Sequence, residues 1–217
     1  MFFFPIGCVL ALLFLLLLPV ILTLAFLNLV SFSFGKLGLP PAIAILVLLL
    51  TLIGSAINIP LTRRKMEYAR DVSPFAFFRR PQISTSGLAI NVGGAIVPLS
   101  LSAYLLTIVS SPWPVLAATA VMTLVSKRLA RPIPGVGIGL PMFVPPVFAA
   151  LLAVLLSPGS AAPCAYIAGT VGTLLGADLL NLRKIERMGG FASIGGAGVF
   201  DGIFLVGVVS VFLTALF

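Results

Sequence analysis

The sequence predicts an all-α fold, a polytopic transmembrane bundle of about seven helices that forms a single integral membrane domain over residues 1–217. Two observations predict this class. The 217 residues are 60% hydrophobic and only 8% charged, whereas soluble domains carry about 25% charged residues. Several uncharged stretches also reach the roughly 20 residues that a helix needs to cross the hydrocarbon core of a bilayer.

The uncharged stretches give the positions of the predicted spans. The first one lacks a basic n-region and a small-residue cleavage site, so it is expected to be a span rather than a secretory signal. The segment at about 62–84 is hydrophilic and is predicted to be a cytoplasmic loop at the lipid headgroups. The predicted spans cover residues 5–30, 39–61, 85–109, 112–126, 139–157, 162–182 and 195–216.

The basic residues predict the orientation of the bundle. Three basic clusters, at 63–80, 127–131 and 183–187, follow predicted spans two, four and six, so they lie on one side of the membrane. Lys36 is the exception among 13 lysines and arginines. The positive-inside rule then predicts a multi-pass protein of the cell membrane with a cytoplasmic N-terminus. The net charge of +8 therefore reflects the predicted orientation of the chain in the membrane. A nucleic-acid partner is not expected, whereas contact with anionic membrane lipids stays open.

Missing residue types narrow the chemistry. The chain has no histidine, which excludes serine–histidine hydrolysis and the HExxH zinc site. No phosphate-binding loop precedes a soluble helix, so ATP-driven transport by this chain alone is excluded as well. Cys8 and Cys164 are predicted at opposite sides of the membrane, too far apart for a disulfide. We expect neither a metal nor a cofactor.

Two of the five acidic residues fall inside predicted spans. Glu67, Asp71 and Glu186 lie among the arginines of the cytoplasmic loops, where solvated ion pairing accounts for them. Asp178 and Asp201 lie in predicted spans six and seven, where a carboxylate costs about 2.5–3.5 kcal/mol at mid-membrane and so indicates function. Either acid alone could instead sit at a helix end, near water or favoured by the helix dipole.

The two aspartates are predicted at matched depth on neighbouring antiparallel helices. Asp178 lies roughly 6 Å and Asp201 roughly 9 Å from the same cytoplasmic edge at 1.5 Å per residue. Two carboxylates brought close together share one proton. The ionised one can take a proton from an attacking water while the protonated one donates to the carbonyl oxygen of a peptide. The sequence does not decide which aspartate is the acid and which is the base, because the two carboxyl groups titrate as a coupled pair.

Helical spacing predicts two different faces for span six. Small residues at Gly169, Gly172 and Gly176 form one stripe that suits close helix contact. The opposite face is expected to be polar and to carry Asp178 with Thr170, Leu174 and Asn181. Asn58 and Asn91 are predicted at a similar depth, where they would extend a polar layer or serve as interhelical contacts.

Two irregular segments suggest a route for a substrate. "GGFASIGGAGVF" before Asp201 is too glycine-rich for a rigid helix, and "RPIPGVGIGLPMFVPP" interrupts the start of span five. Irregular backbone at membrane depth is tolerated where it is buried in protein or lines a watery cavity. The predicted substrate-binding residues are Asn91, Asn181, Gly196 and Gly198.

These motifs resemble known families. "GTLLGADLLNL" followed by "SIGGAGVFDGIFLVG" resembles an uncharacterised prokaryotic multi-pass family, domain of unknown function 1614, over most of the chain. More distantly, the pair of aspartates is similar to the presenilin and signal peptide peptidase class, whose motifs are YD, GxGD and Pro-Ala-Leu. That resemblance implies that Asp178 matches the first motif and Asp201 the second. Ala177 stands in place of the tyrosine, and "GAGVFD" spaces the glycines farther from the acid.

Three functions remain open on these observations. The first is an intramembrane aspartyl protease-like hydrolase that cleaves membrane-embedded peptides with Asp178 and Asp201. The second is a proton- or cation-coupled transporter or channel that uses the same two acids. The third is a scaffold in which the acids only hold helices together.

Overall fold

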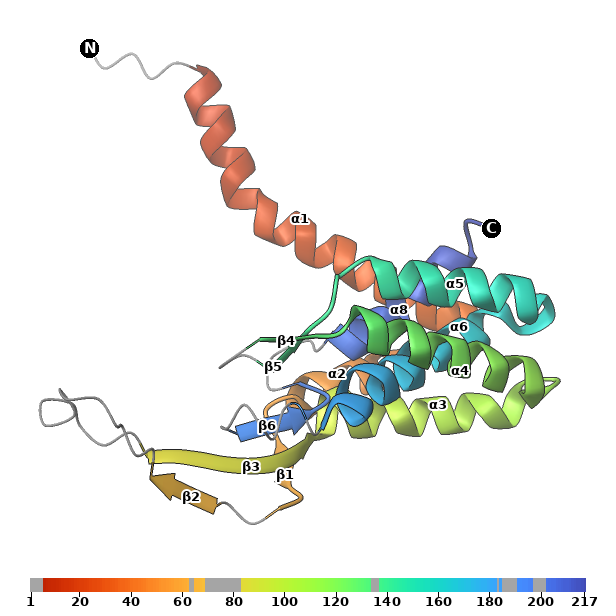
Figure 1. Cartoon of the computed structure of the whole chain (residues 1–217). Coiled ribbons are helices and arrows are strands. Elements are labelled where there is room, and N and C mark those ends of the chain that lie inside the picture. Colours follow the sequence, from red (N-terminus) through yellow and green to blue (C-terminus); the bar gives the residue numbers. More distant parts are fainter. Residues whose placement is uncertain are drawn as a thin grey trace, which may run out of the picture.

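The computed structural model describes residues 6–62, 65–68, 83–133, 137–182, 184, 191–196 and 202–217. This part of the chain is mainly helical, with short strands at one end of a helix bundle (Figure 1). Each of the seven predicted spans contains an α-helix, so the helical class is confirmed. The helices are α1 (Ile6–Lys36), α2 (Pro41–Gly54), α3 (Val97–Ile108), α4 (Pro112–Leu129), α5 (Val144–Leu156), α6 (Ala161–Thr173) and α8 (Gly202–Thr214).

Two helical stretches of the described residues are long and apolar enough to cross a membrane. They are Gly7–Lys36 and Pro158–Asn181. Helices α2, α5 and α8, and the stretch Val92–Ile108 that contains α3, are apolar but shorter. These findings support a membrane protein, and the crossing of the bilayer by seven spans stays a prediction.

Prolines mark where several helices begin. Pro41, Pro98, Pro112 and Pro145 occupy the first turn of α2, α3, α4 and α5. The proline ring fixes φ near the helical value, and its missing N–H is not needed in the first turn. Pro19 lies inside α1, where it removes a backbone hydrogen bond. The N-terminal part of α1 extends away from the other helices (Figure 1).

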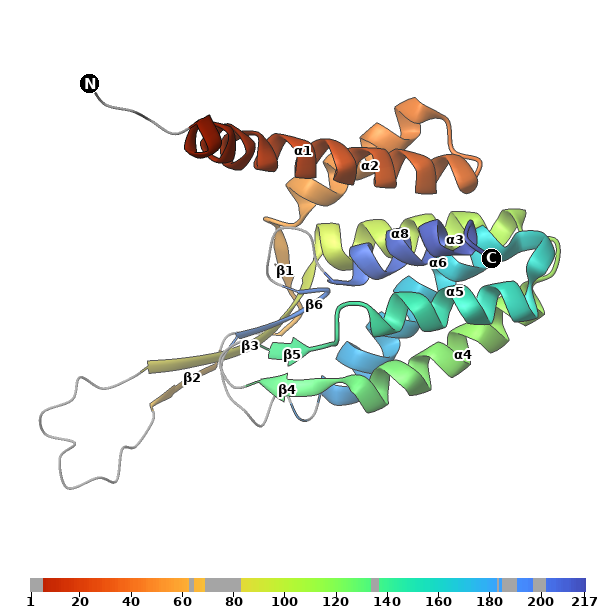
Figure 2. The same cartoon turned by 90° about the horizontal axis from the view of Figure 1, so that it is seen from above.

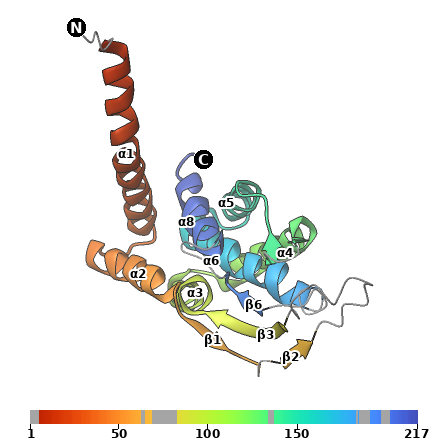
Figure 3. The same ribbon diagram turned by 90° about the vertical axis from the view of Figure 1, so that its left-hand side faces the viewer.

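Helix α6 forms the centre of the bundle. It contacts α3, α4, α5 and α8, and Figure 3 shows these helices around it. The predicted glycine stripe is confirmed as a packing face, because Gly172 and Gly176 lie against α4 and Gly169 lies against α8. A Cβ atom on Gly172 would come within 2.7 Å of the Met122 Cβ. Small residues therefore allow α6 to be surrounded on several sides.

A small sheet covers one end of the bundle (Figure 2). The central strand β3 pairs with β1 and β2 in antiparallel register and with β6 in parallel register. Because Ala89 pairs with both Pro60 of β1 and Ser193 of β6, these two strands lie on opposite edges of β3. The strands are β1 (Asn58–Pro60), β2 (Lys65–Tyr68), β3 (Ile83–Asn91) and β6 (Phe191–Ile194).

The sheet corrects two of the predicted spans. Residues 58–60 and 85–91 were expected to be transmembrane helix and are strands. The segment "ISTSG" of β3 is rich in residues with low helix propensity, and Pro60 suits an edge strand. The proline- and glycine-rich segment before α5 forms a second hairpin, β4 (Arg131–Ile133) with β5 (Gly137–Gly139), so α5 begins at Val144 rather than at 139.

Candidate functional site

Two π-helical segments meet where the bundle joins the sheet. Val92–Ile96 leads from β3 into α3, and Leu174–Asp178 continues α6. Ala95 from the first segment and Leu174 from the second share a small apolar cluster with Ile194 and Ile203. π-helical turns are rare and are frequent at functional sites, because the extra residue redirects side chains.

Asp178 is the last residue of the second π-helical segment and is partly buried. Its Oδ2 atom accepts a hydrogen bond of 2.8 Å from the backbone N–H of Gly195. Gly195 and Gly196 have φ values of 82° and 78°, which favour glycine and turn the chain after β6. A Cβ atom on Gly195 would also lie 2.7 Å from the Cβ of Ala95. The acid of α6 is therefore held against the glycine-rich segment between β6 and α8.

A second polar group surrounds Asn91, which is fully buried. Its Oδ1 atom accepts from the Gly94 N–H at 2.7 Å and so caps the first π-helical segment. Its amide nitrogen donates to the Ser55 carbonyl at 2.7 Å and to Asn58 Oδ1 at 3.1 Å. Asn58 Oδ1 also accepts from the Ser193 hydroxyl at 2.6 Å. Asn58 and Asn91, which were expected at a similar depth on two helices, are thus bonded to each other across paired strands.

Strand β6 joins the two polar groups. Ser193 contacts Asn58 on one side, and Gly195, two residues later, contacts Asp178. Gly93 in the first π-helical segment also packs tightly, because a Cβ atom at this position would overlap the Thr51 carbonyl oxygen of α2. Residues 51–58, 91–95 and 193–195, which are distant in the sequence, are thus brought together beside Asp178.

Asn181 and Gly196 make contacts within their own segments. The Asn181 amide donates to the carbonyls of Gly176 and Ala177 at 3.1 and 3.0 Å, where the helix tightens into a 3-10 turn. Its Oδ1 atom is buried without a hydrogen-bond partner. The Gly196 N–H donates to the Ser193 carbonyl at 3.2 Å. The part of both residues in substrate binding stays a prediction.

Asp201 and Gly198 lie outside the described residues. The predicted proximity of the two aspartates therefore stays a prediction. The described chain resumes at Gly202, the first residue of α8, and Ile203 packs in the same cluster as Leu174 and Ile194.

Sequence reasoning missed β6, the role of Ser193 and both π-helical segments. The signals that could have found them are the glycine pairs Gly93–Gly94 and Gly195–Gly196, which mark close backbone approach and a turn rather than loose helix.

The structure is that of a helical protein with membrane-spanning candidates and a partly buried acid held by a glycine turn. Residues 52–213 match the family described as "Protein of unknown function (DUF1614)". Since the match covers most of the chain, the protein belongs to this family. The match gives no activity and does not connect the chain to the presenilin class. No curated protein and no solved structure matches the chain.

Proposed function

We propose that this protein is a multi-pass cell-membrane hydrolase that cleaves membrane-embedded peptides with Asp178 and Asp201, in the manner of intramembrane aspartyl proteases. One observation carries the proposal. Asp178 is a partly buried acid at the end of an interrupted helix, and it is bonded to Gly195, six residues before Asp201 in the sequence. A buried carboxylate in an apolar bundle is costly, and a chemical role explains why it is present.

The proposal includes seven spans with the sheet on the cytoplasmic side. Support comes from the basic residues, since Lys127 and Arg128 end α4 at the level where Gly176 of α6 packs. Asp178 lies only two residues beyond Gly176. The acid is thus near the basic end of the bundle, which in this proposal faces the cytosol, where water can enter.

The chemistry needs both carboxyl groups and one water. The ionised carboxylate takes a proton from the water as its oxygen attacks the carbonyl carbon, and the protonated one gives its proton to the carbonyl oxygen. As the C–N bond of the tetrahedral intermediate breaks, the leaving amine takes the proton that the first carboxylate removed from the water. The former carbonyl oxygen returns its proton to the second carboxylate, so both acids regain their starting states. The hydrogen bond from Gly195 to Oδ2 would orient the Asp178 carboxylate for this step.

Strand β6 supplies a place for an extended substrate. Within the described residues its partner is β3, which occupies one of its edges. An extended peptide added to the other edge would gain main-chain hydrogen bonds, as in β-augmentation. Such a peptide would run past Gly195 and so beside Asp178. An unwound substrate segment also exposes the carbonyl that the water must attack.

The test is cleavage of a transmembrane peptide by the purified protein in lipid nanodiscs. We expect Asp178→Asn and Asp201→Asn each to lose at least about 100-fold in rate, since each removes one side of the acid–base pair. The side-chain amide oxygen introduced by Asp178→Asn can still accept from the Gly195 N–H, so this variant should keep its melting temperature. Asp71→Asn, in the predicted cytoplasmic loop, is the matched control and should cleave like the wild type.

Cleavage by Asp178→Asn at the wild-type rate would refute the proposal. A second measurement covers the case in which the peptide chosen is a poor substrate. A hydroxyl-containing transition-state analogue should raise the melting temperature of the wild type but not of Asp178→Asn. Proton- or cation-dependent flux into liposomes that is lost with either variant, without cleavage, would instead support the transporter.

A further inference from the structure

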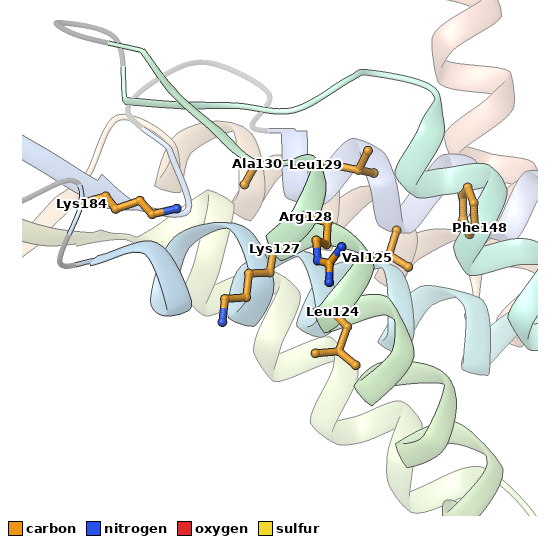
Figure 4. A pocket seen from close by; sticks show the side chains of 8 residues that line it. All are labelled: Leu124, Val125, Lys127, Arg128, Leu129, Ala130, Phe148 and Lys184. Carbon is orange, nitrogen blue, oxygen red and sulfur yellow. The ribbon is translucent and has the colours of Figure 1, made fainter.

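A second site lies on another side of α6, where α4 ends. An open pocket of about 740 Å³ is formed there by α4, by Phe148 of α5 and by Lys184 (Figure 4). Neither Asp178 nor Gly195, which bond to each other, is among the residues that line it. The pocket and the proposed hydrolase site are therefore lined by different residues.

The pocket combines three cations with an apolar wall. Lys127, Arg128 and Lys184 are exposed and line it, and no acidic residue is among the residues that line it. Leu124 and Phe148, which are 62% and 43% exposed, form apolar surface beside the charges. In Figure 4 Lys127 and Arg128 lie near the end of α4, Lys184 comes from a separate segment, and Leu124 lies farther back along α4.

This arrangement fits an amphipathic anion. Arginine and lysine bind phosphate through charge-assisted hydrogen bonds, and basic pockets between membrane helices on the cytoplasmic side suit anionic headgroups. A free phosphate would leave the exposed Leu124 and Phe148 unused. Helix α4 passes from apolar residues to Lys127 and Arg128, which is the order of acyl chain and headgroup in a lipid leaflet.

We propose that this pocket binds an anionic phospholipid of the cytoplasmic leaflet. The phosphate lies between Lys127, Arg128 and Lys184, and the acyl chains lie along Leu124 and Phe148.

The test is native mass spectrometry of the purified full chain in detergent, titrated with phosphatidylglycerol or with phosphatidylcholine of the same acyl chains. We expect phosphatidylglycerol to bind at least about tenfold more tightly, because each basic residue near an anionic headgroup contributes to affinity. The double variant Lys127→Gln/Arg128→Gln should lose this preference. Lys36→Gln/Arg131→Gln removes the same charges outside the lining and should keep it.

Three results would overturn the proposal. These are equal affinity for the two lipids, equal loss in both double variants, and displacement of phosphatidylglycerol by inorganic phosphate at similar concentration, which would indicate a phosphate site. If the Lys127→Gln/Arg128→Gln variant does not fold, the salt dependence of lipid binding to the wild type provides the test. Its preference for phosphatidylglycerol must then fall with rising salt, since exposed charges are screened.

Discussion

Helix α1 and the stretch Pro158–Asn181, which contains α6, are both long and apolar enough to cross a membrane, yet their burial in the bundle differs. The first is exposed along most of its length, as Leu16 shows at 73% exposure, whereas Tyr166 of α6 is fully buried. Side-chain size accounts for the difference, because α1 is rich in leucine whereas most residues of α6 are glycine, alanine or threonine. Apolarity alone therefore predicts a membrane helix, and small residues predict which helix other helices surround.

The two helices also differ in their relation to the family and the site. The family match begins at residue 52, so it includes α6 and every described site residue and leaves out α1. Helix α1 joins the bundle only near its C-terminal end, where the Ser33 hydroxyl donates to the Val208 carbonyl at 3.0 Å. We therefore expect substitutions in α1 to lower the free energy of unfolding less than substitutions in α6.

The largest expected effect is at the glycine stripe of α6. Gly176→Ala places a methyl group onto the Thr123 carbonyl oxygen and near Ser126 of α4. Overpacking of this kind costs about 1–3 kcal/mol of unfolding free energy. Reversible unfolding in mixed micelles measures the loss, and displacement of the π-helical segment should also reduce any Asp178-dependent activity.

Gly35→Ala in α1 is the matched control, because nothing lies within 4 Å of the added Cβ atom. It should be neutral or should stabilise by up to about 1 kcal/mol, since alanine favours helix. Equal effects of the two glycine substitutions would show that the centre of the bundle is not set by small residues.

A gain in stability is expected at Tyr166. Its hydroxyl is buried without a hydrogen-bond partner in the described structure, and an unsatisfied buried polar group costs about 1–3 kcal/mol. Tyr166→Phe should therefore raise the free energy of unfolding by about 1 kcal/mol in the same assay. Tyr104→Phe, on the exposed face of α3, should have no effect. A clear loss with Tyr166→Phe would reveal a partner for the hydroxyl.

A smaller effect is expected where α6 bonds to α3. The hydroxyls of Ser102 and Thr170 are 2.9 Å apart, and either can be the donor. Each hydroxyl also lies within hydrogen-bond distance of a carbonyl four residues earlier, Pro98 for Ser102 and Tyr166 for Thr170. Ser102→Ala should cost about 0.6 kcal/mol, the average for side-chain hydrogen bonds between membrane helices. Ser100→Ala removes a bond to Ile96 within the same stretch of helix and serves as the comparison. A double-mutant cycle with Thr170→Val isolates the pair.

The smallest effect is expected in the exposed half of α1. Leu16→Ala should change the free energy of unfolding by less than about 0.5 kcal/mol, since exposed positions contribute little. Thermal unfolding of the detergent-solubilised protein measures this. A loss of several kcal/mol would mean that α1 packs against another chain, and the contrast between the two helices would then fail.

Much of the site could be predicted from local spacing. The intervals between Gly169, Gly172 and Gly176 predicted a packing face, and the single carboxylate in an apolar stretch singled out Asp178. Asn58 and Asn91 were expected at one depth and are bonded. These features follow from helical periodicity and from the cost of polar groups in an apolar bundle, which are readable along the chain.

The sequence by itself determined an apolar, mainly helical chain and the positions of its polar residues. Only the tertiary structure decided that residues 83–91 form a strand and that Ser193 binds Asn58, 135 residues away. It also decided that Gly195 meets Asp178. The reason is physical: a local pattern reports which side of a segment is buried, whereas a strand takes its hydrogen bonds from segments that only folding brings beside it.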